Sequence, residues 1–101
     1  MTQLRIETLR IGEELELRLD GELDVATAED FACAVLATPP GSTIVLALDQ
    51  LMFLDSSGLR AILHARNAGR RIELANPRPS ILRVLEIAAV LEELPLRPTA
   101  A

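Results

Sequence analysis

An unbroken run of five apolar residues, Ile44 to Leu48, constrains the fold of this chain more than any other feature of its sequence. Gly41 precedes the run and Asp49 follows it. A strand with one face in water alternates polar and apolar residues, so an unbroken run of this length indicates a strand buried on both faces. Such strands occur in sheets that are covered by helices. The run therefore predicts an α/β fold with a central strand at 43–48.

Two segments before this run alternate apolar and charged side chains. In residues 14–20 leucines occupy every second position, and residues 3–9 follow a similar pattern. A period of two predicts strands with one buried face and one wet face. Gly12 lies between the segments, where a tight turn is needed, so we expect an antiparallel hairpin.

Later segments have the spacing of amphipathic helices. Apolar residues recur every three to four positions between Asp24 and Pro39, from about Ser57 to Ala68, and from Ser80 to about Ile87 or beyond. Thr27 stands three positions before Asp30, which resembles a weaker form of the capping box that starts a helix. These patterns predict three helices.

Two further strands complete the order. Residues 71–74 alternate in polarity, and a short edge strand is expected at 94–97, where Pro95 excludes a central position. Strand–helix–strand units imply parallel pairing through right-handed crossovers, and 101 residues suit one domain. We therefore predict a single domain over residues 1–97, in which about three helices cover a mixed α/β sheet of four to five strands. A frayed tail is expected at 98–101.

The charge balance of the chain excludes several classes of partner. The formal net charge is −5, which disfavours binding to nucleic acid and to an anionic membrane surface. No apolar run approaches the ~20 residues that span a bilayer, and the first residues lack the apolar centre of a signal peptide. We therefore expect a cytoplasmic protein with no direct nucleic-acid contact and no membrane insertion, whose partners are other proteins.

Nothing in the sequence indicates an enzyme. Metal-ligand spacing, glycine-rich nucleotide loops and paired catalytic carboxylates are absent from the sequence. Cys33, the only cysteine, is interpreted as a small packing residue of a helix, and His64, the only histidine, as a surface residue. We expect no catalytic residue, no metal site and no cofactor.

The most informative stretch, Asp55-Ser56-Ser57-Gly58, joins the buried strand to the second helix. Strand-to-helix turns in open α/β sheets are where ligands and partners meet the protein. Ser56 is expected just before the first helical turn, where its hydroxyl can cap backbone N–H groups and where a phosphate would be favoured. A phosphate beside Asp55 would add about −1.5 to −2 charge and would change docking more than folding. A helix cap with no further role is the alternative for both residues.

Two motifs together give the sequence its resemblance to a known family. Asp55-Ser56-Ser57-Gly58-Leu59, after the apolar strand, looks like the signature of STAS-domain anti-anti-sigma factors. Gly21-Glu22-Leu23-Asp24, followed by Thr27-Ala28, resembles the second marker of this family. The resemblance extends from about Leu4 to Leu91 and includes the spacing of the motifs. It implies the STAS fold and a role as an anti-sigma factor antagonist.

The resemblance also implies partners and residue roles. The serine that an ATP-binding anti-sigma factor kinase phosphorylates in the family matches Ser56, with Ser57 as a second candidate. The unphosphorylated protein would bind the kinase and release a sigma factor, and a serine phosphatase would reset the switch. Asp24 matches a residue implicated in kinase contact and phosphoryl acceptance, and capping of a helix is its alternative role. Partner binding is therefore expected to involve Asp24, Asp55, Ser57, Gly58 and Arg60.

The sequence departs from the family pattern at two places. Arg60 stands where many members have glycine, and it is expected to contact a partner or a phosphate, with a solvated helix position as the alternative. The glycine before the last strand is missing, and Ala88-Ala89-Val90 occupies that stretch. The third helix is therefore expected to continue and the last strand to be reduced.

Two other functions are compatible with the same residues. One is a non-switching module, such as an accessory STAS subunit of a lipid-transport ATPase or part of a stress-sensing scaffold. The other is a binder of a small ligand or nucleotide in a cleft beside Asp24. Neither function depends on phosphorylation of Ser56.

Overall fold

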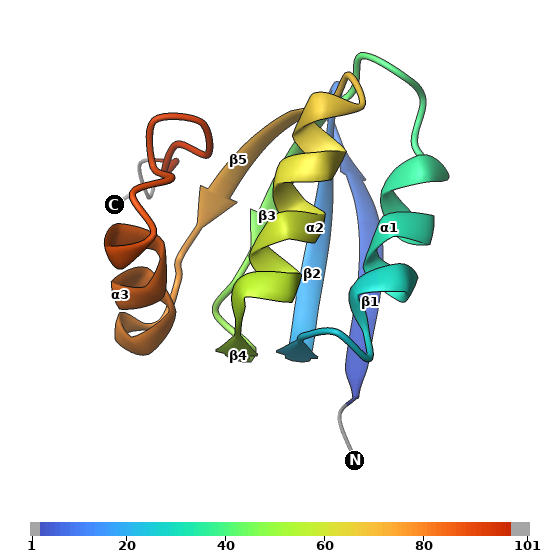
Figure 1. Cartoon of the computed structure of the whole chain (residues 1–101). Helices are drawn as coiled ribbons and strands as arrows, with labels where there is room; N and C mark the ends of the chain where they lie inside the picture. Colours follow the sequence, from blue (N-terminus) through green and yellow to red (C-terminus); the bar gives the residue numbers. More distant parts are fainter. Residues whose placement is uncertain (1–2, 98–101) are drawn as a thin grey trace.

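Five strands and three helices form the part of the chain, residues 3–97, that a computed structural model describes (Figure 1). In chain order they are β1 (Leu4–Ile11), β2 (Glu14–Leu23), α1 (Ala28–Leu36), β3 (Thr43–Ala47), β4 (Leu51–Leu54), α2 (Ser56–Asn67), β5 (Arg71–Ala75) and α3 (Pro79–Ile87). The three predicted helices are confirmed. The tail expected at 98–101 lies outside the described residues.

The sheet is mixed and five-stranded, as predicted. β1 and β2 form the expected antiparallel hairpin, and β2, β3 and β5 pair in parallel. β4 also pairs in parallel with β2, beyond the segment that β3 occupies, so two short strands follow each other along one long strand. β2 therefore continues to Leu23, past the predicted end at residue 20. Residues 51–54, where the sequence analysis predicted no strand, form β4.

Helices cover one face of the sheet and bury an aliphatic core against it. In Figure 1, α2 lies in front of the centre of the sheet, α1 beside it, and α3 on the other side of α2 near β5. All residues of the run Ile44–Leu48 are buried, which confirms the predicted central strand. Phe31 of α1 is a fully buried aromatic ring of this core. No helix within residues 3–97 has the length and apolar character needed to cross a membrane.

The end of the chain differs in part from the prediction. α3 ends at Ile87, and Ala89 has a φ of 57°, so the expected continuation of this helix does not occur. The strand expected at 94–97 is reduced to a single bridge between Leu96 and Leu74, in agreement with the missing glycine. Proline within that segment supplies no backbone N–H for a longer ladder.

The lone cysteine and histidine both lie at the surface. Cys33 on α1 is exposed, so its predicted packing role is wrong. The helix directs Phe31 and Val35 into the core instead, and these two positions share a face that excludes residue 33. His64 on α2 is exposed, as predicted. No group of three or more potential metal ligands occurs among the described residues.

Arg70 is a buried cation that connects the C-terminal ends of α1 and α2. Only 7% of its surface is exposed, and its guanidinium donates hydrogen bonds to the Thr38 carbonyl (2.6 Å), the Thr38 hydroxyl (3.3 Å) and the Ala68 carbonyl (3.1 Å). Thr38 and Ala68 lie just beyond the two helices, whose last carbonyls carry partial negative charge. The buried charge is therefore balanced by two helix ends.

Arg97 connects the last described residues to the face of the sheet that the helices leave open. Its guanidinium donates two hydrogen bonds to the Glu14 carboxylate and one, at 2.8 Å, to the Glu73 carboxylate. Glu14 and Glu73 alternate with buried residues of β2 and β5, which places their side chains on the open face. The hydrogen bonds from Arg97 lower the pKa of Glu14.

Replacement of Arg70 by methionine is expected to destabilise the protein by about 1–3 kcal/mol, because buried carbonyls at Thr38 and Ala68 lose their donor. Denaturant unfolding followed by circular dichroism measures the loss. Arg71→Met is the matched control, because the neighbouring arginine is exposed and its loss should change stability by less than about 0.5 kcal/mol. Equal stability of the two variants would contradict a stabilising role for the buried guanidinium.

Replacement of Arg97 by glutamine is expected to raise the pKa of Glu14 toward 4.5, its ordinary value. Because the pKa of Glu14 is lower in the folded than in the unfolded protein, the contact stabilises the fold fully at a pH above the ordinary pKa. This stabilisation is lost as the pH falls through the lowered pKa. The stability difference between wild type and Arg97→Gln should therefore be largest near neutral pH and shrink in acid. NMR titration of the Glu14 carboxyl group measures the shift, and an unchanged pKa would exclude the contact in solution. Arg83→Gln, at an exposed position on α3, is the control.

Candidate functional site

Asp55 caps the N-terminus of α2, and Ser56 does not, contrary to the prediction. Asp55 has an extended backbone, and its carboxylate accepts a hydrogen bond from the Gly58 N–H at 3.0 Å. The Asp55 carbonyl accepts a second bond from the Leu59 N–H at 2.9 Å. Ser56 is therefore the first helical residue instead of the residue before the helix. Its hydroxyl is not needed for the cap.

The two serines differ in accessibility. Ser56 is exposed, whereas Ser57 is half-buried and lines a groove between α1 and α2. N–H groups in the first turn of a helix have no acceptor within the helix and make this end partly positive. The exposed Ser56 hydroxyl is thus the more accessible group at the positive end of α2.

Gly58 allows the first turn of α2 to rest directly on the end of β2. It is buried, and a β-carbon at this position would overlap the Leu23 carbonyl oxygen and come within 2.9 Å of Leu23 Cγ. The Asp55 N–H donates to the same carbonyl across a long 3.5 Å. The two sequence motifs, at 21–24 and 55–59, are therefore in direct contact.

Asp24 is buried in the loop between β2 and α1, where it organises the backbone. Its Oδ1 accepts hydrogen bonds from the N–H groups of Ala26 (2.9 Å) and Thr27 (3.2 Å). The Thr27 hydroxyl accepts from the Asp24 N–H at 3.0 Å and donates to the Glu22 carbonyl at 2.8 Å. The predicted capping box is wrong, because Thr27 uses its hydroxyl within the loop and Asp30 is exposed.

Asp24 therefore stabilises the loop that leads into α1, and it does not cap the helix itself. Only 6% of its surface is exposed. A cavity of about 580 Å³ lies beside its loop, but Asp24 is not among the lining residues. Direct contact between Asp24 and a kinase stays a prediction.

Three large apolar side chains are exposed near the serines. Val25 follows Asp24, and Met52 and Phe53 occupy the two middle positions of β4; their exposed fractions are 76%, 58% and 48%. β4 pairs with the end of β2, so all three lie near the carboxyl ends of these strands, next to the start of α2. Exposed large apolar side chains beside a polar site are typical of a protein-binding surface. We call Val25, Met52 and Phe53 the apolar edge.

Sequence reasoning did not find the apolar edge. Leu51 and Leu54 are buried while the two residues between them are exposed, so the strand lacks simple alternation. The signal that was available is the pair Met52-Phe53 directly before a candidate switch motif.

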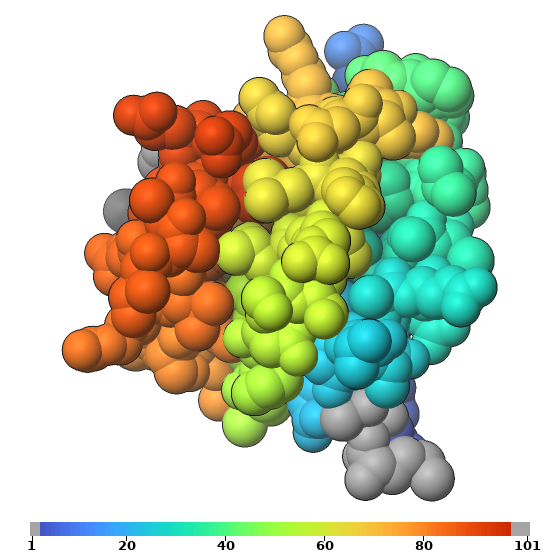
Figure 2. All heavy atoms as spheres, in the orientation of Figure 1, coloured from blue at the N-terminus to red at the C-terminus, as the bar shows by residue number. Residues whose placement is uncertain are grey.

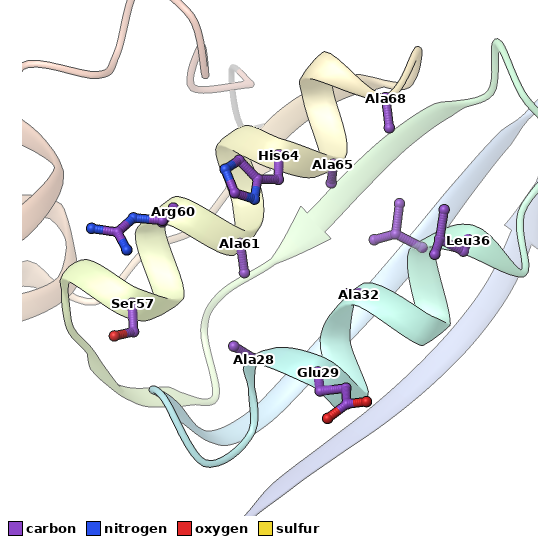
Figure 3. A pocket seen from close by; sticks show the side chains of 11 residues that line it. Ala28, Glu29, Ala32, Leu36, Ser57, Arg60, Ala61, His64, Ala65 and Ala68 are labelled. Atoms are coloured by element: carbon purple, nitrogen blue, oxygen red, sulfur yellow. The ribbon is translucent and has the colours of Figure 1, made fainter.

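Arg60 is exposed one turn beyond Ser56 on α2. Side chains four residues apart on a helix are neighbours. The ion pairs between described residues do not include Arg60, and Figure 3 shows its guanidinium directed away from α1. Contact of Arg60 with a partner or with a phosphate on Ser56 stays a prediction.

Comparisons with known proteins agree with this architecture. The family model described as the STAS domain matches residues 5–101. An anti-sigma factor antagonist from Mycobacterium paratuberculosis superimposes with a TM-score of 0.82 at 21% identity, over 96% of this chain and 87% of that one. The antagonist SpoIIAA in its unphosphorylated form gives 0.70 at 24% identity, over 93% and 89% of the two chains. The Bacillus cell fate determinant SpoIIAA in its phosphorylated form gives 0.64 at 25% identity, over 95% and 92%.

Replacement of Gly58 by alanine is expected to destabilise the protein by about 1–3 kcal/mol, because the added methyl group overlaps the Leu23 carbonyl. Without the overlap, alanine would stabilise a helix by up to about 1 kcal/mol relative to glycine. A loss of stability would therefore show that the overlap is present, and a gain would show that it is not. Denaturant unfolding measures it, with Ser57→Ala in the same turn as the control. A Gly58→Ala protein as stable as wild type would show that α2 is not tightly seated on β2.

Proposed function

The chain belongs to the STAS-domain family, and from this membership we propose that it is an anti-sigma factor antagonist switched by phosphorylation of Ser56. The unphosphorylated form binds an ATP-binding anti-sigma factor kinase in the cytoplasm and so releases a sigma factor. Phosphorylation of Ser56 ends this binding, and a serine phosphatase restores it. The chain itself catalyses no reaction.

The observation that carries the proposal is the position of Ser56. Its hydroxyl is exposed at the first position of α2, beside Asp55 and near the apolar edge. A kinase active site can reach such a group without unfolding the helix. Similarity to a cell fate determinant whose structure was determined in a phosphorylated form, at 25% identity, supports the same role.

The fold can accept a phosphate on Ser56 at little cost. The N-terminal end of a helix favours anions, and the first turn of α2 contains no acidic residue. The Asp55 carboxylate is engaged with the Gly58 N–H and keeps the helix capped in both states. Phosphorylation should therefore leave the backbone of α2 in place.

A docked partner, in contrast, cannot accept the phosphate easily. Binding would bury the apolar edge and exclude water from the surface around Ser56. A phosphate adds about −1.5 to −2 charge there, directly after the Asp55 carboxylate. Taking that charge out of water without a paired cation costs several kcal/mol. The affinity of the complex should fall while the stability of the free protein does not.

The remaining candidate residues support this surface in different ways. Ser57 is a second acceptor, but its half-buried position favours Ser56. Gly58 seats the helix on β2, and Asp24 holds the loop that presents Val25. Arg60 offers an exposed cation to an acidic group of the kinase.

The proposal predicts phosphorylation at a single serine. Incubation with ATP and an anti-sigma factor kinase encoded in the same genome should label Ser56, as mapped by mass spectrometry. Ser56→Ala should abolish labelling, whereas the matched control Ser57→Ala should retain it. Ser56→Glu should weaken binding to the kinase about tenfold or more, equivalent to about 1.4 kcal/mol, and leave the unfolding midpoint nearly unchanged. Labelling of Ser57 alone, or equal binding of Ser56→Glu and wild type, would contradict the switch.

A further inference from the structure

The last described residues of the chain, 95–97, lie against the outer edge of β5. The Leu74 N–H donates a hydrogen bond to the Pro95 carbonyl at 2.9 Å, and the Arg97 N–H donates to the Leu74 carbonyl at 2.7 Å. Leu96 completes the contact through its bridge with Leu74. Residues 95–97, which we call the strap, therefore take up both backbone groups of Leu74.

The strap itself is not anchored in the core. None of its three residues is buried, whereas Leu94, directly before it, is fully buried. A cavity of about 480 Å³ lies beside the strap, and its lining includes Ile72, Glu73 and Pro95. Figure 2 shows the C-terminal segment, in red, at the margin of the molecule, with no other described element over it on this side. Segments with few buried apolar contacts open locally while the rest of a domain stays folded.

The Arg97 side chain holds the strap across the open face of the sheet. Glu14 and Glu73, which accept its hydrogen bonds, belong to β2 and β5, and β3 lies between these two strands. Val45 of β3 is the register partner of Glu73, and only 5% of its surface is exposed on the face that the helices leave open. The guanidinium therefore spans the central strand and joins both of its neighbours to the strap.

Two carboxylates account for the charged contacts of Arg97. Its hydrogen bonds lower the pKa of Glu14 from the ordinary value of 4.5. Glu16, the next residue on the same face of β2, is bonded to Arg18 at 2.8 Å. The other charged residues of the surrounding segments are Glu13, Arg71, Glu92 and Glu93. No ion pair between described residues joins any of these four to Arg97, so its closure depends on Glu14 and Glu73.

We propose that the strap is a pH-sensitive closure: Arg97 holds residues 95–97 on the edge of β5 while Glu14 and Glu73 are ionised, and the strap opens in acid. Protonation removes the negative charge that the guanidinium binds. Closure is fully favoured at a pH above the ordinary pKa of Glu14 and is lost as the pH falls through the lowered pKa. Opening leaves the N–H and carbonyl of Leu74 unpaired and makes β5 a free strand edge, which is a template for pairing with other chains.

Amide hydrogen exchange at Leu74, measured by NMR and divided by the intrinsic rate at each pH, tests the proposal. The Leu48 N–H donates to the Ala75 carbonyl at 2.9 Å on the other edge of β5, so it is the internal reference for opening of the sheet. Arg97→Gln should lower the protection of Leu74 relative to Leu48 about fivefold or more at neutral pH, because the strap loses its charged contacts.

Arg18→Gln is the matched control. Arg18 also binds carboxylates on the open face, those of Glu16 and Glu7, but these belong to β2 and β1. Its loss should leave the ratio of the two protection factors unchanged. Denaturant unfolding of each variant verifies that it is folded.

Acid provides the second arm of the test. In wild type the protection of Leu74 relative to Leu48 should fall as the pH drops through the lowered pKa of Glu14. The double variant Glu14→Gln, Glu73→Gln should have the lower ratio at every pH. Equal loss of protection at Leu74 and Leu48 in Arg97→Gln would overturn the proposal, because the arginine would then stabilise the whole sheet. A wild-type ratio that does not change in acid, or a ratio that Arg18→Gln lowers as much as Arg97→Gln, would overturn it as well.

Discussion

The close contact between Gly58 and the carbonyl of Leu23 determines where α2 begins on the sheet, and therefore where Ser56 lies. α2 can begin directly on the end of β2 only because no side chain intervenes at this position. The contact brings together two loops that are more than thirty residues apart in the sequence, one with Asp24 and one with Ser56. It also places the first turn of α2 next to β4, and therefore next to Met52 and Phe53. A displaced helix would separate Ser56 from these exposed apolar side chains.

β2 is the element on which this arrangement is built. It pairs with β1 on one side and with β3 and then β4 on the other. The ends of parallel strands meet at one edge of a sheet, so the loops that follow β2 and β4 emerge together. Within the first of these loops, the Asp24 carboxylate and the Thr27 hydroxyl take up backbone groups that would otherwise be unpaired. Asp24 and Thr27, which the sequence analysis matched to a family motif, thus also stabilise the backbone of this loop.

The sequence predicted those parts of the fold that depend on long periodic patterns. The run Ile44–Leu48 and the alternation in β2 are signals of burial, and burial decides which elements pack together. Short elements were not predictable in the same way, because β4 has four residues and exposes the middle two. Cap assignments failed where neighbouring side chains compete: Asp55 takes the cap that was expected for Ser56, and the Thr27 hydroxyl serves the Asp24 loop. The burial of Arg70 could not be predicted from the sequence. Its carbonyl partners lie at the ends of two helices, and these ends come together only in the folded protein.

The bonds made by Arg70 join the C-terminal ends of α1 and α2 below the surface of the protein. Burial keeps the Arg70 guanidinium away from mobile ions, so salt screens these bonds little. Arg60 and Glu29, in contrast, are exposed, and charges at the surface are screened within about 8–10 Å at cellular ionic strength. Added salt would therefore weaken the interactions of these surface charges more than the bonds that join the two helix ends. The surface of the helix pair would respond to the ionic environment, whereas the packing of its ends would respond far less.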